Sequence, residues 1–382
     1  MSKRIRWAIA SFLILTGSAL ADTHQWSKDK ANAWYAQHRW LVGSNYVPTD
    51  AINQLEMFQA ETFDPAQIDK EFGWAEGLGM NTMRVFLHDQ LWTQDAAGFK
   101  QRLDQFLGIA AKHKIKPLLV FFDSCWDANP KPGPQHAPVP GVHNSGWVQS
   151  PGKAGLADAA NYPKLEAYVR DVIGAFKDDK RILGWDLWNE PDNAFGGAGP
   201  DSPEGREKIR LVTALLPRVF EWARAANPSQ PLTSGVWIRD DWATAEKLTA
   251  VERVQLLQSD IITFHDYSWP EVFERRIKQL QTYGRPILCT EYVARGAGST
   301  FDQSLPIAHK YDVGVINWGF VLGKTQTNLP WDSWQKPYVD SQPVVWHHDI
   351  FHPDGKPYRQ AELDLIRATT AQAEREFAKR AR

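Results

Sequence analysis

The segment Ile182-Leu-Gly-Trp-Asp-Leu-Trp-Asn-Glu-Pro191 decides the predicted fold. Its apolar residues are typical of a short buried strand, and Pro191 ends that strand because proline cannot donate to a ladder. Glu190 is therefore expected at the carboxyl end of the strand. The segment Pro286-Ile-Leu-Cys-Thr-Glu291 places a second carboxylate at the end of a second strand, 101 residues further on. If both strands belong to one parallel barrel, the two acids meet at the same face.

Short β-rich runs alternate with amphipathic segments along the chain, which indicates parallel strands joined by helices. Strands are predicted at 40–45, 82–88, 117–123, 182–190, 231–237, 261–267, 286–291 and 313–320. Helices are predicted at 95–113, 162–176, 203–226 and 271–283, with a further helix at 26–38 that would close the barrel bottom. Asp64 and Pro65 supply an N-cap and a first-turn proline for another helix. The predicted fold class is α/β, a single (β/α)8 TIM barrel.

Two predicted connections are much longer than the usual few residues. One covers 124–156 after the third strand, and the other runs from 321 to about 357 after the eighth. Both leave the carboxyl ends of strands, the face on which barrel enzymes carry their active sites.

Tryptophan is unusually frequent, with 18 in 382 residues. Core packing accounts for about half of them on the simplest interpretation. The others lie in loops beside proline and glycine, where a flat apolar face suits the C–H face of a sugar ring. These loop residues are Trp126, Trp147, Trp269, Trp331 and Trp334.

The first 21 residues have the composition of a secretory signal peptide. Lys3, Arg4 and Arg6 precede an apolar stretch, and cleavage is expected after Ala21. The mature chain, 22–382, is expected to be one catalytic domain that is secreted or periplasmic and does not bind a membrane. Without the leader, 40 basic residues face 45 acidic ones with no block of like charge. Nucleic acid is therefore not an expected partner.

The sequence has only two cysteines, Cys125 and Cys289, so no disulfide framework holds the fold. The strand assignment puts them near strands three and seven, on opposite sides of the barrel. Two free thiols are predicted; a single bridge is the alternative in an oxidising compartment.

Several polar residues are predicted to point into the barrel beside the carboxylates. Strand alternation places Asp186, Trp188 and Glu190 on one face. Arg84 has inward parity on the second strand, where it could bind Glu291, pair with Asp186, or do both.

Further along the second strand, His88 reaches the rim by the same parity as Arg84. It could touch substrate or be a satisfied rim residue. His265 and Tyr267 share an inward face on the sixth strand, near both carboxylates.

In these residues the chain resembles the retaining β-glycosidases of glycoside hydrolase clan A, most closely the cellulase-like family 5. The resemblance extends over nearly the whole mature chain. Its residues, in chain order, are Arg84, Asn189-Glu190-Pro191, His265-Asp266-Tyr267, Glu291 and Trp318.

The resemblance implies a role for each matched residue. Glu190 would be the general acid/base, Glu291 the nucleophile, and Asn189 the partner of the sugar 2-hydroxyl. His265 and Tyr267 would orient or tune the carboxylates, and Trp318 would form the floor under the attacked sugar. Other rim residues, Trp126 after the third strand and Trp237 after the fifth, could contact neighbouring sugars or pack their own loops.

No cofactor is expected. The segment His347-His348-Asp349 with His352 lacks the helical spacing of zinc hydrolase motifs, so no metal site is assigned. The Gly-x-Gly-x-x-Gly pattern and the phosphate loop are both missing from the sequence.

The resulting hypothesis is a monomeric glycosidase that acts on a β-linked carbohydrate by double displacement. Its two carboxyl groups are expected about 5 to 5.5 Å apart, the separation for retention. Mannan, glucan and xylan types of substrate all remain open. The long loops could wall the groove into a pocket for exo action or extend a cleft for endo action. A non-catalytic carbohydrate-binding protein and a transglycosylase on the same barrel are the alternatives.

Overall fold

The computed structural model describes residues 25–194 and 199–380. The strands are β1 (Val42–Asn45), β2 (Thr82–Phe86), β3 (Lys116–Asp123), β4 (Gly184–Asn189), β5 (Leu232–Thr233), β6 (Ile262–His265), β7 (Ile287–Glu291) and β8 (Gly314–Asn317). The helices are α1 (Lys28–Tyr35), α2 (Gln54–Phe58), α3 (Pro65–Gly77), α4 (Asp89–Lys112), α5 (Lys153–Ala157), α6 (Tyr162–Phe176), α7 (Pro203–Ala225), α8 (Ala250–Gln258), α9 (Pro270–Gln281), α10 (Phe301–Lys310) and α11 (Gln360–Arg380). Short 3₁₀ turns are η1 (Ala159–Asn161), η2 (Ala245–Lys247), η3 (Arg295–Ala297) and η4 (Trp331–Trp334).

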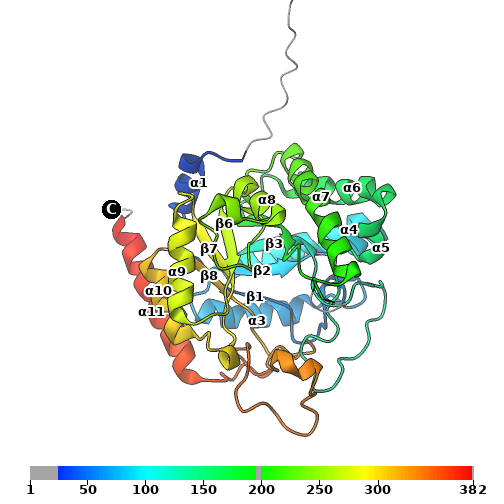
Figure 1. Ribbon diagram of the computed structural model, residues 1–382. Helices are drawn as coiled ribbons and strands as arrows, with labels where there is room; N and C mark the ends of the chain where they lie inside the picture. The colour runs from blue at the N-terminus through cyan, green and yellow to red at the C-terminus, as the bar shows by residue number, and fades with distance from the viewer. Residues whose placement is uncertain (1–24, 195–198, 381–382) are drawn as a thin grey trace, which may run out of the picture.

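The strands form one parallel barrel with helices outside it (Figure 1). The strand order is β5-β4-β3-β2-β1-β8-β7-β6, and an isolated parallel bridge between Val236 and Phe264 joins the two ends. The predicted fold class is thus confirmed, and each of the eight strands lies within or beside its predicted range.

The fifth strand is shorter than predicted because side chains replace part of its ladder. The N–H of Ser234 donates to the hydroxyl of Ser259, and the carbonyl of Gly235 accepts from the side chain of Gln255. Only Leu232 and Thr233 keep regular pairing with β4.

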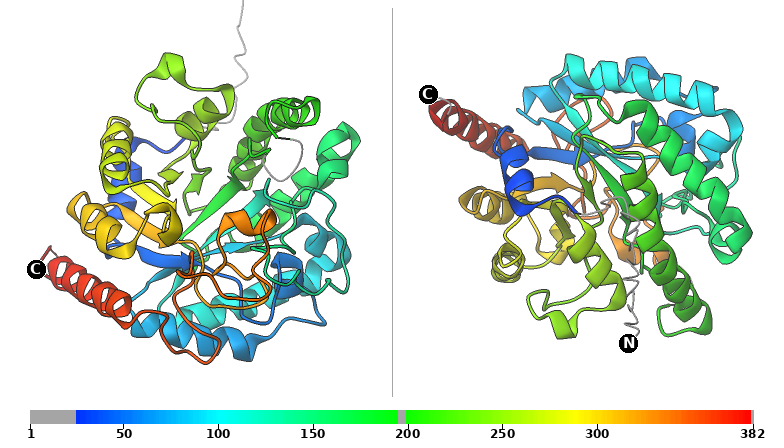
Figure 2. Two further views of the ribbon diagram at one scale, coloured as in Figure 1. Left: turned by 60° about the horizontal axis from the view of Figure 1, so that its bottom comes forward. Right: turned by 90° about the horizontal axis from the view of Figure 1, so that it is seen from above.

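An apolar layer fills one end of the barrel interior. Figure 2 shows the ribbon of α1 beside the barrel. Trp34 and Tyr35 of α1 pack against this layer. Its members, one from each of six barrel segments, are Leu41, Leu118, Leu183, Ile261, Leu288 and Ile316. The prediction that the first helix closes the barrel bottom is confirmed.

Other local predictions can be compared directly with the structure. Asp64 accepts from the N–H groups of Ala66 and Gln67 and so caps α3. Cys125 and Cys289 are free thiols, as predicted. The predicted signal peptide lies outside the described residues. None of the described helices has the length and apolar character needed to span a bilayer.

The two long loops after β3 and β8 are bonded to each other. The N–H of Asn144 donates to the carbonyl of Thr325 at 2.8 Å, and the N–H of Tyr338 donates to the carbonyl of Gly141 at 2.9 Å. His143 adds a bond from its ring Nδ1 to the carbonyl of Leu329 at 2.8 Å. The loops therefore form one wall across the carboxyl face of the barrel.

Candidate active site

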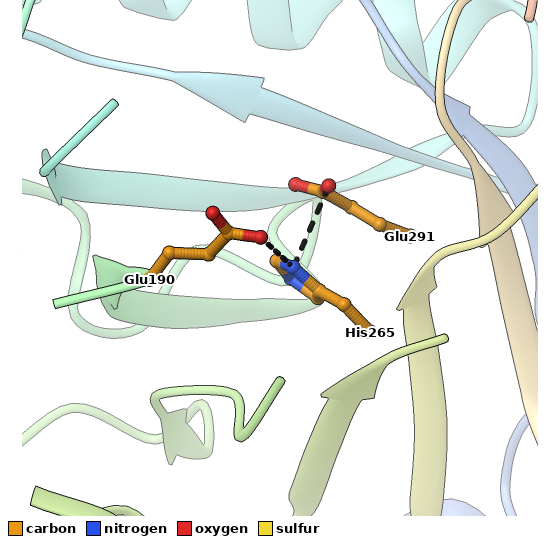
Figure 3. Close-up of side chains that lie close together, drawn as sticks. All are labelled: Glu190, His265 and Glu291. Carbon is orange, nitrogen blue, oxygen red and sulfur yellow. Dashed lines mark hydrogen bonds and ion pairs between the residues drawn. The ribbon is translucent and has the colours of Figure 1, made fainter. Parts of the chain in front are cut away.

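Glu190 and Glu291 face each other at the carboxyl face of the barrel, with His265 between them (Figure 3). One ligand atom from each of these three side chains lies within 4.8 Å of the other two. Both acids are almost fully buried. The sequence prediction that the two strand ends present their acids to a common point agrees with this geometry.

Strand alternation alone does not explain how Glu190 reaches the site. The consecutive residues Asn189 and Glu190 both line the pocket, which a regular strand does not allow. Glu190 has φ +43°, a left-handed conformation that is uncommon for a residue with a side chain. Trp188, expected on the same face, instead packs against Phe122 and donates to the hydroxyl of Ser124. The turn after β4 therefore aims the acid, and the strand parity does not.

A bulge in β7 aligns Glu291 with His265. Phe264 pairs with Cys289, whereas the next residue of β6, His265, pairs with Glu291 and leaves Thr290 as the extra residue. Bulges of this kind re-aim side chains next to active sites.

Arg84 ties the base of the site together. It is fully buried and reaches Glu291 Oε1 from Nη1 at 3.0 Å and Asp186 Oδ2 from Nε at 2.9 Å. Its Nη2 donates to Asn189 Oδ1 at 2.7 Å, and its Nη1 donates also to Asn45. The two predicted roles of Arg84, binding Glu291 and pairing with Asp186, are both observed. Arg84 lies beneath the pocket and does not line it.

Glu291 has a second donor in Tyr267, whose hydroxyl lies 2.8 Å from Oε2. A cation and a hydroxyl on the two carboxylate oxygens favour the ionised form of Glu291. Glu190 has a different set of neighbours. Asn193 donates to its Oε2 at 2.7 Å, and the Cys125 thiol donates to the same oxygen at 3.3 Å.

Burial raises the pKa of both carboxyl groups, and their neighbours act against it to different degrees. The Arg84 guanidinium and the Tyr267 hydroxyl lower the pKa of Glu291, whereas proximity to Glu190 raises it. Only Glu291 has a guanidinium bonded directly to it. When one proton is shared between two such acids, it therefore favours Glu190.

His265 is neutral at ordinary pH, because burial lowers its pKa to about 4. Its Nδ1 lies 2.8 Å from Glu190 Oε1 and 3.5 Å from Glu291 Oε2. It therefore links the two acids without adding a charge.

A cavity of about 550 Å³ opens above the two acids. It is lined by both of them and by six further residues predicted from the sequence, Trp126, Asn189, Trp237, His265, Tyr267 and Trp318. Such a volume suits a sugar or a short oligosaccharide.

Most of the loop tryptophans also gather at this cavity. Trp126, Trp147 and Trp331 line it, and Trp334 stacks on Trp126 with ring centres 4.8 Å apart. Trp269 does not line the cavity; it is exposed beside Gly298.

His88 is not at the cavity. The strand ends at Phe86, and His88 is the fully buried N-cap of α4, where its Nδ1 accepts from the N–H of Gln90. Its Nε2 bonds the carbonyl of Gln149 at 3.0 Å. His88 is therefore a structural histidine with both ring nitrogens bonded, and it is not placed to contact substrate.

The histidines of the β8 loop do not belong to a group of potential metal ligands in the part of the chain that the structure describes. Nδ1 of His348 lies 2.6 Å from the carbonyl of Val293, and Asp349 accepts from the hydroxyl of Thr327. Within the described ranges, the group of potential ligands found together is Glu190, His265 and Glu291. The Arg84 guanidinium is already bonded to Glu291, so a metal ion at this triad would lie close to an existing positive charge.

Sequence analysis missed several polar residues that line the cavity, among them Cys125, Asn144 and Asn193. Cys125 was considered only for a disulfide, and Asn193 and Asn144 lie in loops that carry no pattern.

No protein-family model and no curated protein matches this sequence. Solved structures do match in fold. A GH5_18 protein from Streptomyces cattleya, in complex with GlcNAc, has 12% identity and a TM-score of 0.57, with 88% of this chain and 80% of that chain covered.

Two further matches are a mannosidase and a mannanase by their names. The exo-β-1,4-mannosidase Op5Man5 from Opitutaceae bacterium strain TAV5 has 17% identity and a TM-score of 0.59, with 87% of this chain and 60% of that chain covered. The endo-β-1,4-mannanase from Thermotoga petrophila has 13% identity and a TM-score of 0.55, over 89% and 78%. The barrel is one that glycoside hydrolases use. This likeness in fold agrees with the family 5 resemblance in the sequence.

Proposed function

We propose that this protein is a retaining β-glycoside hydrolase that works by double displacement. The observation that carries the proposal is the approach of Glu190 and Glu291 within one cavity, with ligand atoms inside 4.8 Å. Retaining enzymes hold their two carboxyl groups about 5 to 5.5 Å apart, and inverting enzymes about 6.5 to 9.5 Å. The approach of one oxygen of each acid to within 4.8 Å supports the closer arrangement.

In the first step Glu291 attacks the anomeric carbon of the bound sugar while Glu190 gives its proton to the leaving oxygen. The bond from the carbon to that oxygen breaks, and an ester to Glu291 forms with inversion. Glu190, now ionised, takes a proton from water as the water attacks the same carbon. The ester breaks with a second inversion, and both acids return to their starting forms.

The proposed substrate is a short β-linked oligosaccharide, attacked at a chain end. The bonded β3 and β8 loops support this choice, because they wall the cavity where an endo-acting enzyme needs an open groove. β-Mannosides are the first substrates to test, since a mannosidase and a mannanase share this fold. Export of the mature chain, from the basic and apolar character of residues 1–21, is part of the proposal.

The test is a screen of the purified mature chain on aryl β-glycosides and β-linked oligosaccharides, with NMR of the first product anomer. We expect turnover with a β-anomer as the first product. Glu291→Ala should abolish turnover, whereas Glu166→Ala, on the exposed side of α6, should not. An α-anomer as the first product would refute retention. Binding without turnover in the wild type would favour a carbohydrate-binding protein.

A further inference from the structure

The turn that carries Glu190 is bonded to two parts of the cavity wall. It covers residues 190–193, and the N–H of Asn193 donates to the carbonyl of Glu190 at 2.8 Å. The side-chain amide of Asn193 returns to the acid and donates to Glu190 Oε2 at 2.7 Å. Asp192 is bonded to Trp237 instead, since its Oδ1 accepts from the indole Nε1 at 2.7 Å. One turn therefore contacts both the catalytic acid and an aromatic side chain.

The ring of Trp237 is open to a ligand. Trp237 lines the cavity and is partly exposed. The bond to Asp192 takes the indole N–H, which is the one polar group of a tryptophan side chain. The part of the ring left for a ligand is therefore apolar, and it suits the C–H face of a sugar.

Burial makes the bond between Asp192 and Trp237 important to both residues. Asp192 is 8% exposed, and burial raises the pKa of its carboxyl group to about 6. The bond from Trp237 lowers that pKa, whereas the nearby carboxylates of Glu252 and Glu190 raise it. A buried carboxyl group needs a donor, and the indole supplies one. The bond therefore fixes the orientation of the ring relative to the turn.

Trp237 and Trp318 line the cavity from different parts of the barrel. Trp318 follows β8 and packs edge-on against Phe86, the last residue of β2, with ring centres 5.9 Å apart. Trp237 follows β5, which is the neighbour of β4 in the sheet. The aromatic wall beside the acid is therefore the one that contains Trp237.

The proposed mechanism places the leaving group against this wall. Glu190 gives its proton to the leaving oxygen, so the leaving group lies beside Glu190 and its turn. Trp237 is bonded to that turn through Asp192. A leaving group that is a sugar can therefore stack on Trp237, whereas a leaving group without a ring cannot.

We propose that Asp192 is a positioning residue that holds Trp237 as the platform for the leaving sugar, so that the enzyme selects substrates whose leaving group is itself a sugar. This inference rests on the proposed glycosidase function and deepens it. Asp192 does not touch the substrate and acts through Trp237.

The test uses two uncharged variants, Asp192→Ala and Asp192→Asn. Both remove the negative charge near Glu190, but only alanine removes the acceptor for the indole. On a disaccharide that the wild type cleaves, Asp192→Ala should lower kcat/KM about 10-fold, and Asp192→Asn should lower it less than about 3-fold. On the glycosyl fluoride of the attacked sugar, whose leaving group has no ring, both variants should match the wild type. Equal losses in the two variants would assign the effect to the charge, and equal losses on the two substrates would assign it to the general structure of the site; either result would overturn the inference.

A binding measurement separates the platform from acid catalysis. The probe is a sulfur-linked analogue of the disaccharide, which resists hydrolysis, and its affinity is measured by calorimetry beside that of the monosaccharide. Asp192→Ala should bind the disaccharide analogue about 10-fold more weakly than the wild type and should bind the monosaccharide equally well. Unchanged affinity for the analogue would refute the role of Asp192. The expected pattern of binding in a protein without turnover would refute the proposed hydrolase alone.

Asp171→Ala is the matched control, because Asp171 accepts from the indole Nε1 of Trp92 at 2.7 Å on the outside of the barrel. It should leave kcat/KM and both affinities unchanged. If Asp192→Ala does not fold, Trp237→Phe removes the donor and reduces the platform while it keeps a ring. Trp237→Phe should then show the loss on the disaccharide alone, and a loss on both substrates or on neither would overturn the inference.

Discussion

Tyr267→Phe tests how the structure keeps Glu291 ionised. The hydroxyl of Tyr267 lies 2.8 Å from Glu291 Oε2, and the ring packs edge-on against Trp331 with centres 5.2 Å apart. Phenylalanine keeps the ring and removes only the donor. A hydrogen bond to a charged group contributes about 1.5 to 3 kcal/mol, and 1.36 kcal/mol corresponds to one pKa unit. Arg84 remains on Oε1 and compensates in part, so the pKa of Glu291 should rise by about one unit.

The assay is the pH dependence of kcat/KM, whose acid limb reports the ionisation of the nucleophile in the free enzyme. The acid limb should move up by about one pH unit in Tyr267→Phe. Below the wild-type limb, kcat/KM should then fall about 10-fold, because the ionised fraction falls by that factor. Well above the limb, the two enzymes should differ much less.

Tyr162→Phe is the matched control, since its hydroxyl donates to the carbonyl of Leu156 at 3.1 Å on the outside of the barrel. Its profile should match that of the wild type. An unmoved acid limb in a folded Tyr267→Phe enzyme would mean that Glu291 is not the group that titrates there, and the assignment of the nucleophile would be refuted.

Two further predictions concern buried acids. Cys125→Ala removes a donor at 3.3 Å from Glu190 Oε2, so the pKa of Glu190 should rise and the alkaline limb of kcat/KM should move up by about half a unit to one unit; an unchanged limb would show that the thiol does not tune the acid. Burial raises the pKa of the Asp349 carboxyl group to about 7 in the native state. Below the unfolded-state pKa of about 4, the group is protonated in both states and its burial as a charge costs nothing. As the pH rises from about 4 to 7, the native state therefore loses stability relative to the unfolded state. Asp349→Asn does not titrate at this position, so its advantage over the wild type in free energy of unfolding should grow by about 2 to 3 kcal/mol from pH 5 to pH 8, measured by urea titration. A difference that does not change with pH would contradict the buried charge.

The strands and both carboxylates could be predicted because their signals are local. Apolar runs closed by Pro191 or by a charged residue identify strand ends, and parallel topology brings those ends to one face. His88 was misplaced for a related reason. The parity argument assumed that the strand continued past Phe86, whereas the chain turns there and His88 caps a helix. The alternation of side chains predicts where a residue points only for residues within the strand.

The parts of the site that sequence could not supply are those that depend on contacts between distant loops. Asn144 takes its place from Thr325, 181 positions later, and no local pattern in either loop names the other. The sequence of these loops predicts that they are long and irregular, but it does not predict which residues they contact in the fold. The catalytic residues of a barrel enzyme thus lie at its strand ends, whereas its choice of substrate depends on how its loops pair. In this protein Asn144 lies where the two paired loops meet the cavity wall, so the shape of that wall depends on the pairing, whereas Glu190 and Glu291 are placed by the ends of β4 and β7.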